Sequence, residues 1–456
     1  QHELGVEALG AAFVEDADAA LTLIYQPDSL LKATLRYEQI AISDDPRLSR
    51  TPRQPGAAIR VGMIVANLVD DVVAYSKRVV SFARHIDTDR FQLHVYSSEN
   101  LCLRTRQLPA RCLAQTSTEW APKTMAFLKE RNVPVYLAPR NTPYIETAQI
   151  LARRIASDAI DILIVQSGPA MPIDWLACRW APVPVKLHIH IGAPLYQRGI
   201  YATFFDNAVN LERERATWPE YAGRLVLLRK GTDIDVLDSQ SALSRAAFGL
   251  PPDAVLIGVL SNHIDKRLSP AYLDVIASVL AAEPQAAFVA IGGRELPPHA
   301  VAYFKAANLF HRVHHIPGQR QVGCALKILD IYASEFPVGG SQSVVEAMAC
   351  SLPVVAMRYG ATHVECAGAD IVGAPIAIES NDPEAYRNLL LHWVRDPDAR
   401  RNAGADLRKR AQTKFSIHDY VRQVCAFGVE KIDTVFKLER TNENPVEPST
   451  SKTISK

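Results

Sequence analysis

Short apolar runs alternate with amphipathic stretches along most of the chain. The first apolar run, at 57–68, is followed by a helical pattern at 72–86 and by a second apolar run at 91–98. Continuous apolar runs of this length are typical of parallel strands that are buried on both faces, and the strand–helix–strand order predicts a βαβ unit. The alternation continues in three further stretches, at 125–138, 147–168 and 181–192.

A second series of strands and helices begins after residues 223–242. Its apolar runs and closing helical patterns lie at 254–262, 286–293, 312–318, 327–334, 370–378, 382–396 and 415–432. The two series predict an α/β protein with two doubly wound, Rossmann-like domains, at 57–225 and 226–415, and a closing helix at 416–437 that packs back on the first domain. Because ligands commonly bind between domains, we expect a cleft between these two.

The two ends of the chain differ from these domains. Residues 1–56 predict a helical extension with recurring leucines and a linker rich in Pro, Arg and Asp. We expect this extension to hold an acceptor, a peripheral membrane contact or a second subunit. Residues 438–456 are polar without periodicity and predict a disordered tail.

Composition restricts the classes of function. The 456 residues are 48% hydrophobic and 22% charged, and the net charge of +1 argues against nucleic acid as a partner, because binding phosphates needs a basic surplus. The seven cysteines include no C-x-x-C pair, so we expect neither a zinc site nor a disulfide framework, and we infer a reducing, cytoplasmic compartment. No apolar run reaches the ~18 residues of a membrane-spanning helix.

The stretch at 334–360, SEFPVGGSQSVVEAMACSLPVVAMRYG, places a glycine-rich turn before an apolar helix and a further strand. Gly339 and Gly340 allow backbone amides to approach a ligand closely, and the helix that follows points its positive end at the same place. The stretch therefore predicts an anion site suited to a diphosphate, without a metal ion. Three side chains supply further hydrogen-bond donors: Ser341, Gln342 and Ser343.

Glu346 supports two interpretations of this stretch. Its carboxylate is an acceptor for sugar hydroxyls, such as those of a ribose. Together with Ser343, however, it also forms the S-x-x-E pattern of a capping box, so helix capping alone is the alternative explanation.

The same residues resemble a known family. The segment EFPVGGSQSVVEAMACSLPVVAMR, at 335–358, is similar to the donor-site motif of GT-B glycosyltransferases. Its second half resembles the EAMACGLPVV ending of the large retaining class, and its first half is closer to the FPFGGGNTT pattern of relatives of O-GlcNAc transferase and bacterial protein N-glucosyltransferases. The resemblance implies the GT-B architecture and a UDP-linked sugar as donor. Many retaining members carry two glutamates separated by seven residues, whereas Val338 lies eight residues before Glu346, and this departure favours an inverting relative.

The resemblance also implies functional residues elsewhere in the second domain. The loop after the strand at 254–262 would meet the donor diphosphate, so that Lys266 or Arg267 stabilises the charge of the leaving group and Asn262 lies nearby. The alternative is an ordinary solvated basic pair. The segment VHHIPGQRQ would hold the base of the nucleotide, flanked by His315 and Gly318.

One histidine of the first domain is the candidate general base. His188 and His190 share one face of a predicted strand, and LHIHIGAP resembles the GHPA loop of bacterial N-glucosyltransferases, which favours His190. A histidine there could deprotonate an acceptor hydroxyl, although a buried structural histidine is an equal alternative.

The sequence therefore predicts a metal-independent glycosyltransferase without a cofactor. It would transfer a sugar from a nucleotide sugar to a hydroxyl or amide acceptor on a glycan, a protein or a small molecule. Two rivals remain open: an epimerase or phosphorylase on the same architecture, and a non-catalytic protein with the same fold that binds sugar nucleotides or acts as a scaffold.

Overall fold

The structure, a computed structural model, describes residues 56–70, 74–99, 117–139, 142, 144–167, 171–189, 199–206, 208–261, 263–319, 321–358 and 368–443. The chain divides into two compact units, the first formed by residues 1–70, 74–203 and 422–456 and the second by residues 71–73 and 204–421. The extension predicted at 1–56 lies, up to residue 55, outside the described residues. The cleft expected between the domains remains a prediction.

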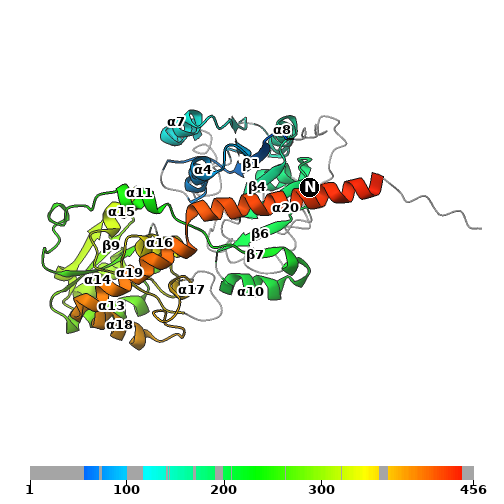
Figure 1. Ribbon diagram of the computed structural model, residues 1–456. Helices are drawn as coiled ribbons and strands as arrows, with labels where there is room; N and C mark the ends of the chain where they lie inside the picture. Colours follow the sequence, from blue (N-terminus) through cyan, green and yellow to red (C-terminus); the bar gives the residue numbers. More distant parts are fainter. Residues whose placement is uncertain are drawn as a thin grey trace, which may run out of the picture. The chain divides into compact units, whose positions relative to one another are not determined.

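A seven-stranded sheet begins with the first apolar run of the chain. Its strand order is β3-β2-β1-β4-β5-β6-β7, and β1 lies parallel to both β2 and β4 (Figure 1). The strands are β1 (Ile59–Val65), β2 (Phe91–Ser97), β3 (Val135–Leu137), β4 (Ile162–Gln166), β5 (Val185–Ile189), β6 (Ala202–Phe205) and β7 (Leu225–Leu227). Every residue of β4 and β5 is buried, as expected for parallel strands with two covered faces.

Amphipathic helices connect the strands of this sheet. They are α4 (Ala74–His85), α6 (Ser117–Trp120), α7 (Pro122–Glu130), α8 (Tyr144–Ser157), α9 (Pro172–Trp180), α10 (Ala208–Thr217) and the 3₁₀ turn η3 (Pro219–Arg224). Asp70 follows β1 and accepts hydrogen bonds from the backbone amides of Lys123 and Thr124, at 3.0 and 2.8 Å. Burial raises the pKa of Asp70, but the hydrogen bonds from these amides outweigh burial, so the net shift of the pKa is downward. Through these bonds the carboxylate caps the first turn of α7.

A five-stranded, all-parallel sheet forms the centre of the second unit. Its order is β10-β9-β8-β11-β12, that of a Rossmann-like half-sheet. The strands are β8 (Val255–Leu260), β9 (Ala286–Ile291), β10 (Val313–Ile316), β11 (Ile331–Ala333) and β12 (Val354–Val355). Between them lie α11 (Ile234–Ser239), η4 (Ala246–Phe248), α12 (Ile264–Arg267), α13 (Pro270–Ala282), α14 (Pro298–Ala306), η5 (Phe310–Arg312), α15 (Val322–Leu326) and α16 (Ser341–Ala349), and after them α17 (Gly368–Val372), α18 (Pro383–Arg395) and α19 (Pro397–Lys414).

Two separate hydrophobic cores cover the faces of this sheet. Alternate residues of β8 divide between them: Ile257 and Val259 pack with α13, α14 and α18, whereas Leu256 packs with α15, α16 and α19. The two-residue period of a strand thus places successive apolar side chains on opposite faces, and helices bury both (Figure 1). The arrangement confirms the doubly wound α/β class predicted from the sequence.

Some element boundaries differ from those predicted. The apolar stretch at 370–378 begins inside the helix α17, and only Ile378 pairs with the sheet, through a bridge to Met357. The last helix, α20 (Ile417–Glu443), continues beyond the predicted end at 437, and residues 444–456 lie outside the described residues. Residues 422–456 group with the first unit, where Gly428 lies against Ile162.

Candidate functional site

The candidate site lies where the strand order of the second sheet reverses, between β8 and β11. Ligands of open α/β sheets bind outside the carboxyl ends of the strands at such a switch point. Here the segment after β8 contributes Arg267, the last residue of α12, and the segment after β11 contributes Glu335, Gly339 and Gly340. The glycine-rich turn predicted as an anion site is therefore at the position where this fold builds ligand sites.

The start of α16 presents backbone amides without a side-chain cap. Gly340 is the N-cap residue, with φ −85° and ψ 132°, and as a glycine it has no side chain that could accept a hydrogen bond from the first turn. The alternative of a capping box at Ser343 and Glu346 is therefore wrong: the N-cap is Gly340, three residues before the serine that such a box requires. The first amides of a helix have no partner within it, and they attract an anion.

The two glycines lie in close contact with neighbouring atoms, and neither has an unusual backbone angle; the backbone contact requires a glycine at Gly339, whereas the atoms near Gly340 belong to side chains that can move. A Cβ atom on Gly339 would lie 2.5 Å from the carbonyl oxygen of Glu335. A Cβ atom on Gly340 would lie 2.5 Å from the Ser343 hydroxyl and 2.7 Å from Nη1 of Arg267. The chain therefore brings the Arg267 guanidinium directly against the N-terminal end of α16.

Arg267 and Glu335 form a partly buried ion pair at this end of α16. Nη1 of Arg267 lies 3.5 Å from Oε1 of Glu335, and the side chains of the two residues are 16% and 0% exposed. Burial raises the pKa of Glu335, while the charge of Arg267 and the backbone amide of Gly340 act in the opposite direction. Sequence reasoning did not include Glu335 in the site, and its only signal was an acidic residue directly before the Phe-Pro pair.

The first turns of α16 carry the remaining predicted side chains. Nε2 of Gln342 donates to Oε1 of Glu346 at 3.3 Å, one helical turn apart. The Ser343 hydroxyl and Oε1 of Gln342 are buried and make no hydrogen bond with the part of the chain that the structure describes. Unsatisfied buried polar atoms at a predicted ligand site are what a missing ligand would leave.

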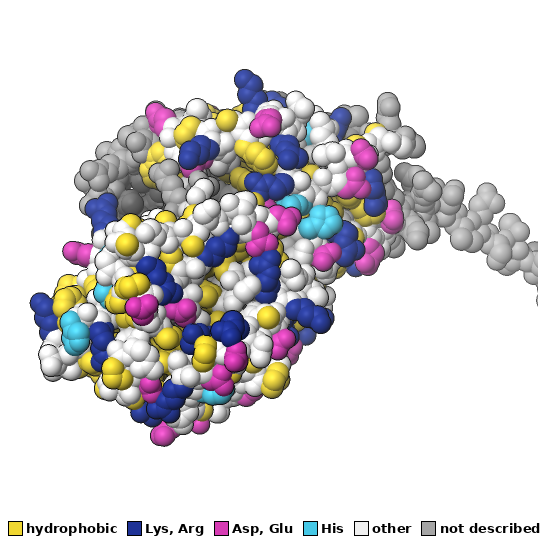
Figure 2. Space-filling model, turned by 60° about the vertical axis from the view of Figure 1, so that its left-hand side comes forward, with side chains coloured by type: hydrophobic (Ala, Val, Ile, Leu, Met, Phe, Trp, Pro, Cys, Tyr) yellow, Lys and Arg dark blue, Asp and Glu magenta, His cyan; other side chains and the backbone are white. Residues whose placement is uncertain are grey.

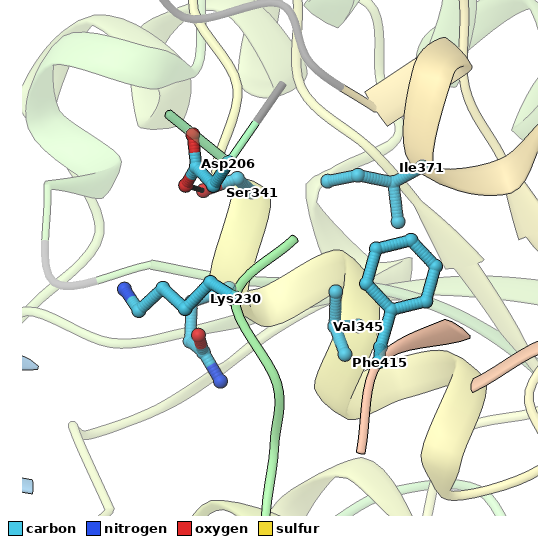
Figure 3. Close-up of a pocket in the computed structure, with 7 residues that line it drawn as sticks. Asp206, Lys230, Ser341, Val345, Ile371 and Phe415 are labelled. Carbon is cyan, nitrogen blue, oxygen red and sulfur yellow. Dashed lines mark hydrogen bonds between the residues drawn. The ribbon is translucent and has the colours of Figure 1, made fainter. Parts of the chain in front are cut away.

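A small pocket opens beside the same helix, within the second unit. It is open to solvent and is lined by Asp206, Lys230, Ser341, Gln342, Val345, Ile371 and Phe415. Figure 3 shows Asp206 against Ser341, whose hydroxyl donates to Oδ2 of Asp206 at 3.3 Å, while Val345 and Phe415 form an apolar wall. Asp206 and Lys230 were not predicted from the sequence, because they come from segments far from the glycine-rich motif.

The segment predicted to hold the base joins the ends of β9 and β10. Nε2 of His315 donates to the carbonyl oxygen of Gly292 at 2.7 Å, and the amide of Gly318 donates to the carbonyl oxygen of Gly293 at 3.1 Å. These bonds fix the two loops against each other. The roles of His315 and Gly318 in binding a base remain predictions.

Of the remaining candidate residues, the structure describes Lys266 and His188. Lys266 is exposed on α12, whereas its neighbour Arg267 contacts the site. Asn262 and His190 lie outside the described residues. His188 is fully buried on β5; its Nδ1 lies 3.4 Å from the Thr203 hydroxyl and its Nε2 lies 3.0 Å from the carbonyl oxygen of Ser167. Because both of its nitrogens are engaged, His188 is a structural histidine.

Surface charge, potential metal ligands and helix length give three further observations. On the face drawn in Figure 2, Lys and Arg side chains are interspersed with Asp and Glu. Within the described ranges, no group of three or more His, Cys, Asp or Glu side chains is placed to hold a metal ion. None of the helices among the described residues has the length and apolar character needed to cross a membrane.

Comparisons with known proteins give a family-model match over part of the second unit and a shared fold. The family described as "Glycosyl transferases group 1" matches residues 251–396, and no curated protein matches the chain. A mutant O-GlcNAc transferase of Thermobaculum terrenum is 16% identical over 96% of this chain and 82% of its own, with a TM-score of 0.61. A glycosyltransferase of Rickettsia africae is 12% identical over 82% and 99% (TM-score 0.60), and Anabaena HepE in complex with UDP and glucose is 13% identical over 81% and 99% (TM-score 0.57).

Proposed function

We propose that this chain, a nucleotide-sugar glycosyltransferase of the GT-B fold, uses a UDP-linked sugar as its donor and transfers the sugar without a metal ion. The observation that carries the proposal is the convergence of Arg267, Gly340 and the N-terminal end of α16 at the switch point of the second sheet. A diphosphate is the part of the donor that such a convergence of positive groups would bind.

The same groups would assist departure of the nucleoside diphosphate. When the bond between the anomeric carbon and the diphosphate breaks, the electron pair remains on the diphosphate oxygen, so negative charge increases there. Arg267 and the first amides of α16 are fixed before the reaction and would stabilise that charge most strongly in the transition state. They supply the positive charge that a divalent cation provides in metal-dependent transferases.

Glu346 would contact the donor through hydroxyl groups. It is 6% exposed on the same face of α16 as Gln342, which lies one turn closer to the diphosphate site. A carboxylate accepts hydrogen bonds from paired hydroxyls, which is consistent with a ribose or a hexose. The acceptor would be a hydroxyl or an amide on a glycan, a protein or a small molecule, and His190 is the proposed base.

Ligand-dependent thermal unfolding tests the donor. The protein is heated alone and with UDP-glucose, UDP-GlcNAc, GDP-mannose or ADP-glucose, each with and without EDTA. A ligand at 100 times its Kd adds about 2.7 kcal/mol to the free energy of unfolding. We expect the largest shift with a uridine compound, unchanged by EDTA. A shift confined to guanosine or adenosine compounds contradicts the UDP assignment, and a shift abolished by EDTA contradicts metal independence.

A further inference from the structure

A buried acid beside a diphosphate site is unexpected, because it would repel the ligand. Glu335 is such an acid: it follows β11 directly, its side chain is fully buried, and Oε2 makes no hydrogen bond within the described ranges. Oε1 lies 3.5 Å from Nη1 of Arg267, and the backbone amides of Glu335 and Gly340 also face the carboxylate. A carboxylate that is buried and only partly paired lowers stability, and a residue retained at such a cost is a candidate for a functional role.

The groups that face Glu335 are those that the donor would need. Arg267 and the backbone amide of Gly340 both favour the ionised form of its carboxylate. The other titratable neighbours are Tyr272 and Tyr332, whose pKa values are raised well above 10 by burial, with the charge of Glu335 contributing. These hydroxyls therefore stay neutral, and the positive charge that acts most strongly on Glu335 is that of Arg267.

We propose that Glu335 is a positioning residue. In the empty site it holds Arg267 at the start of α16, and it binds a proton when the donor diphosphate replaces it as the charged partner of Arg267. This inference depends on the proposed function for the identity of the donor. A proton from solvent moves to the carboxylate, so the buried site holds the negative charge of the diphosphate without that of Glu335. Neutral Glu335 keeps its shape and can still accept a hydrogen bond from Arg267.

Two consequences follow for pH dependence. Donor binding is accompanied by proton uptake and weakens as pH rises, because ionised Glu335 competes for Arg267. In the empty protein, burial raises the pKa of Glu335 above its ordinary value of 4.5. A group of this kind contributes its full stability below its unfolded-state pKa and loses that contribution as pH rises through its folded-state pKa. Ionised Glu335 therefore destabilises the empty protein at higher pH.

Isothermal titration with UDP-glucose tests the inference. UDP-glucose is suitable because its diphosphate, esterified at both ends, does not titrate near neutral pH. Wild-type protein is titrated from about pH 5 to about pH 8 in two buffers of different ionisation enthalpy, beside Glu335→Gln and the control Asp398→Asn, whose exposed pair with Arg401 lies on α19. We expect proton uptake in the wild type and the control but not in Glu335→Gln, and about tenfold tighter binding by Glu335→Gln at high pH.

A purely structural role gives a different result. If Glu335→Gln binds UDP-glucose more weakly at every pH, or if the wild type takes up no proton, the inference is wrong. Arg267→Lys, which keeps the charge but shortens the side chain, should reduce the effect of Glu335→Gln at least threefold, because Glu335 acts through the guanidinium; an undiminished effect also contradicts it.

Failure of the donor assignment can be separated from failure of the inference. Thermal unfolding without ligand should show Glu335→Gln gaining stability relative to the wild type as pH rises above 4.5. If the wild type does not bind UDP-glucose but this gain is present, the UDP assignment is wrong, and the titration is repeated with GDP-mannose, whose diphosphate is the same. If the gain is absent, the inference about Glu335 is wrong whatever the donor.

Discussion

Two buried titratable side chains, each at the end of a parallel strand, have opposite surroundings. On the first sheet, both ring nitrogens of His188 lie within reach of an oxygen atom. On the second, Glu335 has one long contact to Arg267 and one oxygen without a hydrogen bond among the described residues. The complete set of partners marks His188 as structural, whereas the incomplete set marks Glu335 as part of a ligand site. The comparison shows that the partners of a residue, more than its type, distinguish the two roles.

Removing Arg267 should have the largest effect on activity, because it deletes the cation of the proposed diphosphate site on the second sheet. We expect Arg267→Met to lower kcat/KM for transfer from, or hydrolysis of, UDP-glucose by about 10²–10³-fold, the cost of removing one fixed donor to a developing anion. Arg401→Met, which breaks an exposed pair on α19, is the matched control and should change the rate less than twofold. Equal rates for Arg267→Met and wild type would remove Arg267 from the site and return attention to Lys266.

The substitution Gly340→Ala should have the second-largest effect, since it tests the contact between the turn and Arg267. The added methyl group would lie 2.7 Å from Nη1 of Arg267 and 2.5 Å from the Ser343 hydroxyl, so both side chains must move. We expect UDP-glucose to bind about tenfold more weakly, since moving Arg267 weakens one charged hydrogen bond. Gly223→Ala, with no atom within 4 Å of the added carbon, is the control. Calorimetry that finds equal affinities for the two variants contradicts the arrangement.

Ser341→Ala should have a smaller effect on the same site. The Ser341 hydroxyl makes one long bond, 3.3 Å, to Asp206 and lies in the first turn of α16. If the hydroxyl turns to the diphosphate, its loss costs one neutral hydrogen bond, about 0.5–1.5 kcal/mol, or about 2- to 10-fold in Kd. Tighter binding by Ser341→Ala would show instead that the residue acts mainly by holding Asp206 near the anion site.

The sequence predicted the architecture well, because the spacing of apolar residues and the order of strands and helices determine the fold class. Apolar runs and helical patterns predicted the strands of both sheets, and the segment 335–358 predicted the GT-B fold, which the similar solved structures share. The family model for group 1 glycosyl transferases matches residues 251–396. The glycine-rich turn lies at the switch point of the second sheet, and its role as an anion site stays a prediction. The helix start was not located correctly, because S-x-x-E occurs equally inside a helix, where a serine at the third position caps nothing.

Sequence patterns did not identify the residues that reach the site from distant segments. Arg267 and Lys266 are adjacent in sequence, and only the geometry of α12 decides which of them faces Gly340. Asp206 and Lys230 carry no motif, and Glu335 is out of register with the glutamate pair of the retaining class. Such contacts depend on loop conformation, which a periodic pattern does not encode.

The smallest expected effect on the donor belongs to His188→Gln, which tests the other half of the comparison. Glutamine can replace one of the two ring-nitrogen contacts, so the variant should lose about 1–3 kcal/mol of stability through the polar group left unpaired. Its affinity for UDP-glucose should change less than twofold, because the hydrogen-bond partners Ser167 and Thr203 are not residues of the proposed donor site. Chemical denaturation and calorimetry measure the two quantities separately. A well-folded His188→Gln that binds UDP-glucose normally but no longer transfers sugar to an acceptor would mean that a fully bonded histidine can still act as the base, and the rule drawn from Glu335 would not hold.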